Sequence, residues 1–550
     1  MSGVLPLASA IATLDRDALL ALVRQRRVAS PDGVVDSLGL AFELLRSDSL
    51  SRSLQQLERS TLLALAAAAR DADELKDEVI EQLLGLGLLG LDGEHAVALP
   101  EVTAALEAAC AAAGIVLETE RGEPMMPAAE PVDTSGWYAP AITSVRIASA
   151  LMPALREHPA ALGRRGSISA ASVRELAHGV HGSAESIGRL LEVMHESGLL
   201  TTITGFSTRD RHRSFLVPST AAAEWVGLSL QERWVRLAVT AWQRITGAIR
   251  TSLDRAAGDL DRAVFELIPR DFPLLPETAR GQAQQLARLA HDLGLTVHGR
   301  LAPPAQLLDD TLRSGATDAS AVQREAEASF PAQVPGIYVQ PDLSIIIPGP
   351  LAPADERLLS AISEAEHWGV AVTLRVSPAS LRRALAHGLS ADTIRALLER
   401  LSLTGVPQPL DYLLSDLQRL SGAGMDPAEA NEAAEANETT ADPVAPALSA
   451  PAAHSEPTAP ELRGDPLAEL VDRVLAAAAS DSGTGDLGRR LELAIRDRSP
   501  VRVIAAAGGA EHAFTLLPVS LISGRLRATD EVAGVQRTLP LSAIVSVEAA

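Results

Sequence analysis

The sequence has a single cysteine, Cys110, and only 3% aromatic residues. One thiol excludes a disulfide framework and a cysteine-based zinc site within the chain. Cys110 lies in the alanine-rich stretch EAACAAAG, where we expect a small, buried helix residue. Because Ala and Leu dominate and aromatic residues are scarce, the composition favours small, helix-rich domains over β-sandwiches.

Long apolar runs and a surplus of basic residues are also missing. No stretch approaches the roughly 18 consecutive apolar residues that span a bilayer, and the N-terminus lacks a basic segment followed by an apolar core. We therefore expect a soluble, cytoplasmic protein. Because 48 basic residues face 70 acidic ones, for a net charge of −22, any contact with DNA must come from a local basic patch.

The motifs of a nucleotide-driven motor are absent from the sequence. There is no GxxxxGK[ST] loop and no DExH or DExD box, although a motor needs a phosphate cradle, a lysine and a magnesium carboxylate together. His178 and His181 are three residues apart without a clear third ligand, whereas zinc needs three or four. No nucleophile–base–acid set stands out, so we expect no catalytic residue, no metal and no cofactor.

What the sequence does contain is a series of helical segments interrupted by short strands. In residues 1–118, helices precede a strand–turn–strand around Asp92-Gly93, which is the order of a winged helix. The predicted recognition helix, 74–84, is acidic with Lys76 as its one basic residue, which favours a structural or protein-contact role. Residues 119–137 are rich in Glu, Pro and Ala and indicate a linker.

A second winged-helix pattern runs from 138 to 228. Its predicted wing, GFSTRDRHRSFLVP, lies in the most concentrated basic region of the chain. A basic wing suits contacts with phosphates; the alternative is a solvated hairpin tip whose arginines bind nothing. The candidate nucleic-acid-binding residues are Arg209, Arg211, Arg213, Arg189, Arg164 and Arg165.

Residues 229–329 begin with an amphipathic helix. Trp234, Leu237, Ala241 and Ile245 recur at helical spacing, so we expect the indoles of this region in a core rather than stacked on bases. The rest of the region is predicted to be helical, or a degenerate third winged-helix unit.

The region 330–420 alternates strands and helices. PGIYVQPDLSIIIPG predicts two short strands, the apolar spacing over 358–368 predicts a helix, and VAVTLRV predicts another strand. Ser377, which precedes a proline, and Ser390 are the predicted N-caps of two further helices. This order fits one small domain.

Three motifs of this region resemble a known family. YVQPDLSIIIP, LRVSPASLRRALAHGLSADTI and LERLSLTGVP are similar, in that order, to the N-terminal domain of XPB-type DNA helicases and to actinobacterial helicase-associated-domain proteins. The resemblance covers about 90 of the 550 residues. It implies an α/β domain that recognises damaged DNA beside an ATPase motor without being the motor.

The segment 421–463 is rich in Ala, Glu, Pro and Thr and contains acids but no Lys or Arg up to position 461. Such a composition lacks the apolar residues that a packed core requires. We therefore expect a disordered acidic linker.

Residues 464–550 are predicted to form two helices followed by up to five short strands. Pro518, GRLRATD and GVQRTLPLSAI resemble, in order, the WYL domain, a small barrel-like module that senses ligands or nucleic acids. The Trp-Tyr-Leu triplet of that family is replaced by Gly-Arg-Leu. The possible second basic site comprises Arg525, Arg527 and Arg537.

These patterns together predict a mainly α fold with small α+β units. It comprises tandem winged-helix domains, an XPB-N-terminal-like α/β domain and a C-terminal small β-barrel-like module on a flexible linker. We expect a non-catalytic, DNA-associated protein of DNA repair, helicase or transcription machinery. The alternatives are a protein-interaction scaffold without DNA binding, a ligand-responsive WYL-type transcriptional regulator, and a subunit that partners a separately encoded helicase ATPase.

Overall fold

The computed structural model describes residues 3–28, 31–70, 75–93, 95–117, 132–163, 166–205, 213–316, 318–422, 465–480, 485–507 and 510–549. The predicted linkers 119–137 and 421–463 lie wholly or largely outside these ranges. The chain forms two compact units: unit 1 contains Met1–Pro127, Leu267–Arg280 and Ala453–Ala550, and unit 2 contains Ala128–Glu266 and Gly281–Ala452. Both are mainly helical with small antiparallel sheets, as the composition predicts.

The N-terminal part of unit 1 is a set of short helices with one hairpin. Asp15 accepts a hydrogen bond from the Ala18 N–H and Asp36 from the Gly39 N–H, so both act as N-caps. The elements are α1 (Val4–Thr13), α2 (Arg16–Arg26), η1 (Pro31–Gly33), α3 (Ser37–Leu44), α4 (Ser47–Leu54), α5 (Arg59–Ala68), α6 (Asp77–Gly85), β1 (Leu89–Asp92), β2 (His95–Ala98) and α7 (Pro100–Ala113).

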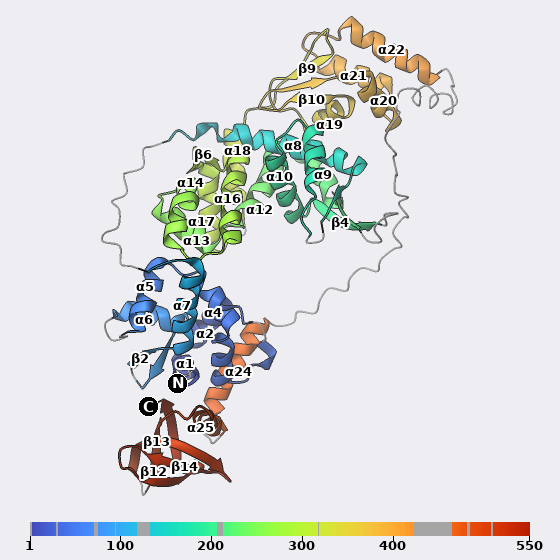
Figure 1. Cartoon of the computed structure of the whole chain (residues 1–550). Coiled ribbons are helices and arrows are strands. Elements are labelled where there is room, and N and C mark those ends of the chain that lie inside the picture. Colours follow the sequence, from blue (N-terminus) through green and yellow to red (C-terminus); the bar gives the residue numbers. More distant parts are fainter. Residues whose placement is uncertain are drawn as a thin grey trace. The chain divides into compact units, whose positions relative to one another are not determined.

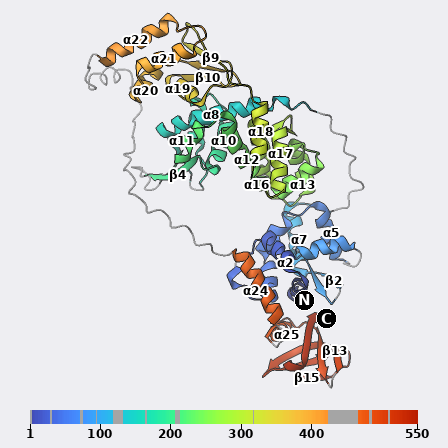
Figure 2. The same cartoon turned by 180° about the vertical axis from the view of Figure 1, so that it is seen from behind.

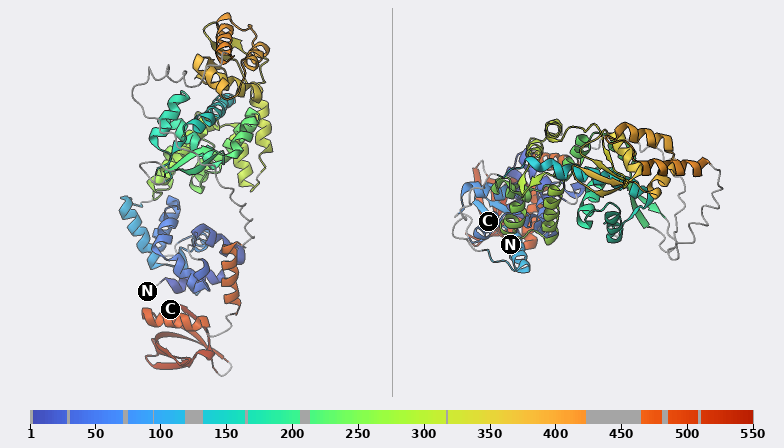
Figure 3. Two further views of the ribbon diagram at one scale, coloured as in Figure 1. Left: turned by 90° about the vertical axis from the view of Figure 1, so that its right-hand side faces the viewer. Right: turned by 90° about the horizontal axis from the view of Figure 1, so that it is seen from above.

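The C-terminal part of unit 1 has two helices and a five-stranded antiparallel sheet. The strand order is β15-β14-β13-β12-β16, with β15 and β16 at the edges, and α25 lies against this sheet (Figure 3). The elements are α24 (Pro466–Ser480), α25 (Gly485–Asp497), β12 (Val501–Ala507), β13 (Ala510–Ile522), β14 (Arg525–Asp530), β15 (Gln536–Pro540), η5 (Leu541–Ala543) and β16 (Ile544–Ala549).

Helix α24 joins the two ends of the chain into one unit. Leu470, Val471 and Val474 of α24 are buried in the same core cluster as the apolar side chains of α2. Along the rim, Arg16 pairs with Asp472 and Arg24 with Asp465, each at 2.8 Å. Figures 1 and 2 show α24 beside the N-terminal helices from opposite sides. The C-terminal module is thus packed on the N-terminal helices.

The first part of unit 2 is helical, with two small sheets. Its elements are η3 (Ser135–Trp137), α8 (Tyr138–Glu157), β3 (Ala160–Ala161), α9 (Ala170–Gly179), α10 (Ala184–Glu196), β4 (Leu200–Gly205), β5 (Arg213–Pro218), α11 (Thr220–Gly227), α12 (Leu230–Trp242), α13 (Gly247–Arg255), α14 (Leu260–Arg262), α16 (Glu277–Asp292), β6 (Thr296–Val297), β7 (Arg300–Leu301), α17 (Pro303–Arg313) and α18 (Ser320–Ser329). A π-helix, η4 (Ala263–Leu267), follows α14, and the next helix, α15 (Ile268–Asp271), belongs to unit 1 together with the first residues of α16.

The tryptophans form the core of this part. Trp137, Trp225, Trp234 and Trp242 are fully buried, which confirms the prediction that the indoles pack in a core. The ring centroids of Trp137 and Trp234 lie 4.9 Å apart. The Trp234 indole N–H donates to the Leu293 carbonyl at 2.8 Å, so the polar atom of this buried ring is satisfied.

The last part of unit 2 is a four-stranded antiparallel sheet with helices on one face. The strand order is β10-β11-β9-β8. The elements are β8 (Tyr338–Val339), β9 (Ser344–Ile347), α19 (Pro353–Ile362), β10 (Glu364–His367), β11 (Val372–Arg375), α20 (Pro378–Ala386), α21 (Ala391–Leu401) and α22 (Gln408–Gly422). Ser377 and Ser390 cap α20 and α21 as predicted, by accepting from the N–H groups of Ser380 and Thr393.

One predicted helix in this sheet domain is too long. The helix expected over 358–368 ends at Ile362, and β10 begins two residues later. Ser363 adopts an extended conformation, with φ of −146°, and ends α19. Residues of β10 then pair with β11, so tertiary strand pairing overrides the helical spacing of Ala365 and Trp368.

Candidate nucleic-acid interface

The elements predicted to bind DNA lie between α8 and α11. A three-stranded sheet of order β3-β5-β4 packs with α9 and α10. Ser183 caps α10 by accepting from the Ser186 N–H, and β4 pairs with β5 from Leu200↔Pro218 to Gly205↔Arg213. The hairpin therefore projects from the end of α10, with Arg213 exposed where β5 begins.

Four of the predicted contact residues cannot be placed. Arg209 and Arg211 fall in the segment 206–212, and Arg164 and Arg165 fall between β3 and α9; these positions lie outside the described residues. Arg213 is thus the part of the predicted basic wing that the structure locates.

Arg189 is engaged in hydrogen bonds within unit 2. Its Nε and Nη2 atoms donate to the Asp292 carboxylate at 2.9 and 2.7 Å, and Nη2 also donates to the Ser186 hydroxyl at 3.0 Å. Only 10% of the Arg189 side chain is exposed. Asp292 is the last residue of α16, where a cation is favourable. The DNA contact predicted for Arg189 from the sequence competes with this ion pair to a residue distant in sequence.

The exposed positions of α10 are mostly acidic. Its apolar residues pack inward, while Glu185, Glu192, His195 and Glu196 face solvent. Glu192 and Glu196 share one ion-pair partner, Arg244, so with Glu185 the exposed side of α10 keeps a net negative charge that repels the phosphates flanking a DNA groove. The helix that would enter the major groove in the predicted domain is therefore poorly suited to do so, and the hairpin is the better candidate.

The second basic site is divided between two faces of the C-terminal sheet. Arg525 and Arg527 alternate with the buried Leu526 and Ala528, so they share the exposed face of β14. Arg537 lies opposite Ala528 and therefore on the other face. Its guanidinium donates to Asp530 at 2.6 Å and lies 4.6 Å from the Phe514 ring centroid.

The Arg537–Asp530 contact also has an electrostatic signature. The pKa of Asp530 is lowered, first by the hydrogen bond from the Ala533 backbone N–H and then by the one from Arg537. Arg537 is thus engaged within the fold, and Arg525 and Arg527 remain as the exposed pair.

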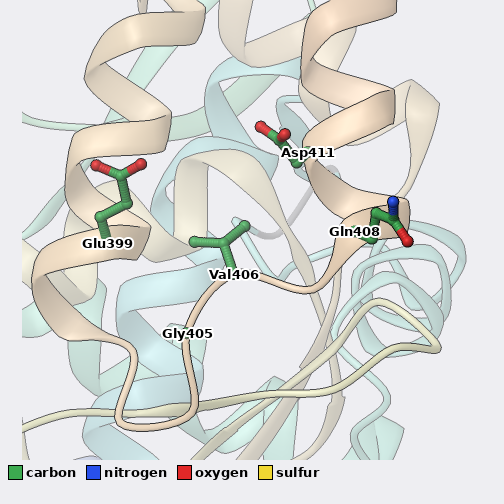
Figure 4. Close-up of a pocket in the computed structure, with 5 residues that line it drawn as sticks. All are labelled: Glu399, Gly405, Val406, Gln408 and Asp411. Atoms are coloured by element: carbon green, nitrogen blue, oxygen red, sulfur yellow. The ribbon is translucent and has the colours of Figure 1, made fainter.

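A pocket of about 430 Å³ lies between α21 and α22. It is lined by Glu399, Gly405, Val406, Gln408 and Asp411, and Figure 4 shows Glu399 and Asp411 on facing helices with Val406 between them. Asp411 accepts from Arg395 at 3.1 Å. Two carboxylates and one apolar side chain suit a cationic or neutral group better than a phosphate.

Arginines of α8 and α12 hold the sheet domain on the rest of unit 2. The Arg146 Nη1 atom donates to the carbonyls of Gly369 and Val370, each at 2.7 Å, and Nη2 donates to Gly349 O at 3.0 Å. Arg233 donates to Glu356 at 2.9 Å. Burial is the main cause that lowers the pKa of Arg146. Sequence reasoning missed both residues, although a charged residue within an apolar helix face is a usable signal.

Neither a metal-binding cluster nor a membrane-spanning helix occurs among the described residues. The ring centroids of His178 and His181 are 6.5 Å apart, and no group of three or more His, Cys, Asp or Glu in these ranges is placed to hold a metal ion. Within the same ranges, every helix is too short or too polar to cross a lipid bilayer.

One family model matches part of the chain. Residues 337–423, which include the four-stranded sheet and α19–α22, match the family described as helicase conserved C-terminal domain. A search of curated proteins gives no match. The match indicates a helicase-related protein and covers the segment in which the sequence motifs resemble XPB-type helicases.

Proposed function

We propose that this chain is a non-catalytic, helicase-associated protein that contacts the DNA backbone through the β4–β5 hairpin. The observation that carries the proposal is the order of α8, β3, α9, α10, β4 and β5, which is that of a winged helix. The hairpin takes the place of the wing, and the arginine-rich sequence TRDRHR runs from between its two strands into the first residue of β5. Helix α10 has a different role in this proposal, because its exposed side is acidic.

A wing that touches phosphates adds affinity without choosing a sequence. We therefore expect the triple variant Arg209→Ala, Arg211→Ala, Arg213→Ala to bind unrelated duplexes more weakly by similar factors. Each phosphate contact contributes about 0.9 to the slope of log K against log salt, so the slope should fall by roughly 2 to 3. Fluorescence anisotropy at several salt concentrations measures both quantities.

The matched control replaces three exposed arginines elsewhere in unit 2, Arg156, Arg324 and Arg357, with alanine. This variant loses the same formal charge, so it separates a local contact from the effect of net charge. Equal losses in the two triple variants would refute the placement on the hairpin. Arg525→Ala with Arg527→Ala would then be the next pair to test.

A protein-interaction scaffold is the second candidate function. The observation in its favour is that most arginines of the sheet domain are already neutralised by carboxylates of that domain. The ion pairs are Arg375–Glu366, Arg383–Glu364, Arg395–Asp411, Arg400–Asp355 and Arg419–Asp416. Such a domain offers little attraction to DNA. A separately encoded helicase ATPase is a partner consistent with either function.

A further inference from the structure

One face of the four-stranded sheet in the sheet domain is partly exposed, with Ile346 and Thr373 half-buried on it. Ile345, Ile347, Val372 and Leu374 point to the helices and belong to the core cluster of this domain. Side chains alternate along a strand, so the intervening residues point to the opposite face. Tyr338 is 42% exposed there and Leu403, on the adjoining loop, is 51% exposed.

The strand register aligns these residues into one row. Tyr338 lies opposite Ile346 in β8–β9, Ile346 opposite Thr373 in β9–β11, and Thr373 opposite His367 in β11–β10. Leu403 extends the row at the β8 edge, because its N–H donates to the Ile337 carbonyl. The row crosses the whole sheet, and its apolar part, formed by Leu403, Tyr338 and Ile346, lies at the β8 side.

The edge of the sheet next to this row is already paired. Ile337 donates to the Leu401 carbonyl and accepts from Leu403 N–H, each at 2.9 Å, and forms a parallel bridge with Ser402. A ligand therefore cannot add a strand beside β8. On the β8 side, binding must therefore use side chains that approach the face of the sheet.

The charged residues around the row indicate which kind of partner this face can bind. The Arg375 guanidinium on this face forms an ion pair with Glu366 and lies 3.8 Å from the Asp342 carboxylate. Glu364 lies opposite Arg375 in the β10–β11 register. Glu364 is in turn paired with Arg383 at 3.2 Å, so two cations stand against three carboxylates and one net negative charge remains. A single-stranded nucleic acid needs cations along its backbone in addition to an aromatic platform, so this face is electrostatically unsuited to it.

We propose that this face, defined by Tyr338, Ile346, Thr373 and Leu403, binds a segment of another protein that presents apolar side chains flanked by Lys or Arg. The apolar side chains cover Tyr338 and Leu403, and the flanking cations approach Asp342 and Glu366, which share the single arginine Arg375. This proposal does not depend on the β4–β5 hairpin, because none of its residues lies in that hairpin.

The size of the face implies a weak contact. Four strands about 4.8 Å apart and about four residues long give an area on the order of 200 Å². This is well below the roughly 800 Å² per partner of a standard stable interface. We therefore expect a dissociation constant on the order of 10–100 µM for an isolated peptide.

The test uses the full chain and three labelled peptides with the same Leu-Phe-Leu centre. Their flanks consist of Lys and Arg, of Glu, or of Ser. We expect the basic peptide to bind at least tenfold more tightly than the other two in fluorescence anisotropy. Tyr338→Thr and Leu403→Ser should each weaken that binding at least fivefold, whereas Val532→Ser, at an exposed apolar residue of unit 1, should leave it unchanged.

Folding of the variants is checked by tryptophan fluorescence, and Ile346→Thr provides a second β-branched substitution at the centre of the row. No binding of the basic peptide up to millimolar concentration would overturn the proposal. Equally tight binding of the acidic peptide would also overturn it, and so would an affinity for the basic peptide that is unchanged in Tyr338→Thr and Leu403→Ser. Binding of a single-stranded oligonucleotide that depends on Tyr338 would assign the face to nucleic acid instead.

Discussion

Gly294 marks a position where the fold of unit 2 tolerates no side chain. It has a φ of +69°, and a Cβ atom there would overlap the Trp137 carbonyl. We predict that Gly294→Ala destabilises unit 2 by more than about 2 kcal/mol, because Ala disfavours this conformation and backbone must move. Denaturant unfolding followed by tryptophan fluorescence tests it.

This probe reports on unit 2 alone. All five tryptophans lie there: Trp137, Trp225, Trp234, Trp242 and Trp368. Gly281→Ala is the matched control, because Gly281 is inside α16 with nothing within 4 Å of an added Cβ. The Gly281→Ala substitution should stabilise unit 2 by about 0.5–1 kcal/mol, which is the helix preference of Ala over Gly. Similar effects of the two substitutions would contradict the steric argument.

At the residue scale, the sequence correctly predicted the features that depend on residues close by in the chain. The caps Ser377 and Ser390 follow from the residues next to them, and the spacing of Trp234 revealed a buried face. Arg26 was not foreseen: it is buried and donates to the carbonyls of Leu86 and Gly87 at 2.9 and 3.3 Å. Its acceptors lie some 60 residues away, and burial lowers the pKa of Arg26 to about 10.

At the scale of elements, the Arg189–Asp292 pair connects α10 to the end of α16. Removing one partner of a buried pair leaves an unpaired charge, which costs about 3–5 kcal/mol when burial is complete. Asp292 keeps 22% of its side chain exposed, so we predict a loss of about 2–3 kcal/mol for Arg189→Ala, below that range. Tryptophan-detected unfolding measures this loss, and anisotropy should show unchanged affinity for DNA.

Arg419→Ala provides the control, because its pair with Asp416 is exposed on both sides and should contribute less than about 1 kcal/mol. If Arg189→Ala instead reduced the salt slope of DNA binding without altering stability, Arg189 would return to the list of phosphate contacts.

The elements differ in how well the sequence indicated them. The hairpin β4–β5 and helices α9 and α10 follow from alternation, glycine turns and apolar spacing. Strand β10 does not, because the spacing of Ala365 and Trp368 fits a helix equally well. The indole N–H of Trp368 donates to the Val180 carbonyl, and a contact across 188 residues leaves no trace in a local pattern.

At the scale of the whole molecule, unit 1 is assembled from both ends of the chain. We predict that cleavage at a protease site inserted within the predicted linker 421–463 leaves the C-terminal fragment bound to the rest, because α24 buries Leu470, Val471 and Val474 against the N-terminal helices. Co-elution in size-exclusion chromatography after cleavage tests this. Separate elution of the two fragments at neutral pH would contradict it.

The charged rim of α24 provides a matched control. Arg16→Asp with Arg24→Asp places like charges opposite Asp472 and Asp465 and should separate the fragments; adding Asp465→Arg and Asp472→Arg should rejoin them. Hydrogen bonds from Arg24 and Arg16 are the main causes that lower the pKa values of Asp465 and Asp472. Their contribution is therefore present above the usual Asp pKa of about 3.9 and is lost as pH falls through the lowered values.

We also predict that the purified chain does not hydrolyse ATP, with or without DNA, because the sequence has no phosphate-binding loop. A phosphate-release assay with single-stranded and forked DNA tests it. DNA-stimulated hydrolysis that persists through repurification and follows the protein peak would show that the chain contains an ATPase site of another kind.

The union of the two chain ends was beyond the reach of sequence patterns. The sequence of residues 464–550 resembles a separate domain. The amphipathic spacing of α24 shows that one side of this helix is buried but does not show that it packs against α2. Arg16 and Asp472 are 456 residues apart, and such pairings are decided by the tertiary fold. The sequence predicted the sheet domain better, because its motifs are contiguous and include the residues that cap its helices and form its turns.

This union has a consequence for biosynthesis. Helix α24 begins about 350 residues after α7 ends at Ala113. At about 5–20 residues per second, the ribosome delivers α24 roughly 20 to 70 s after the N-terminal helices have emerged. During that interval, the apolar side chains of the N-terminal helices that pack against Leu470, Val471 and Val474 are not yet covered by α24. Nascent chains should therefore engage chaperones at this surface until translation is almost complete, and ribosomes stalled before residue 465 should carry chains that remain bound to them.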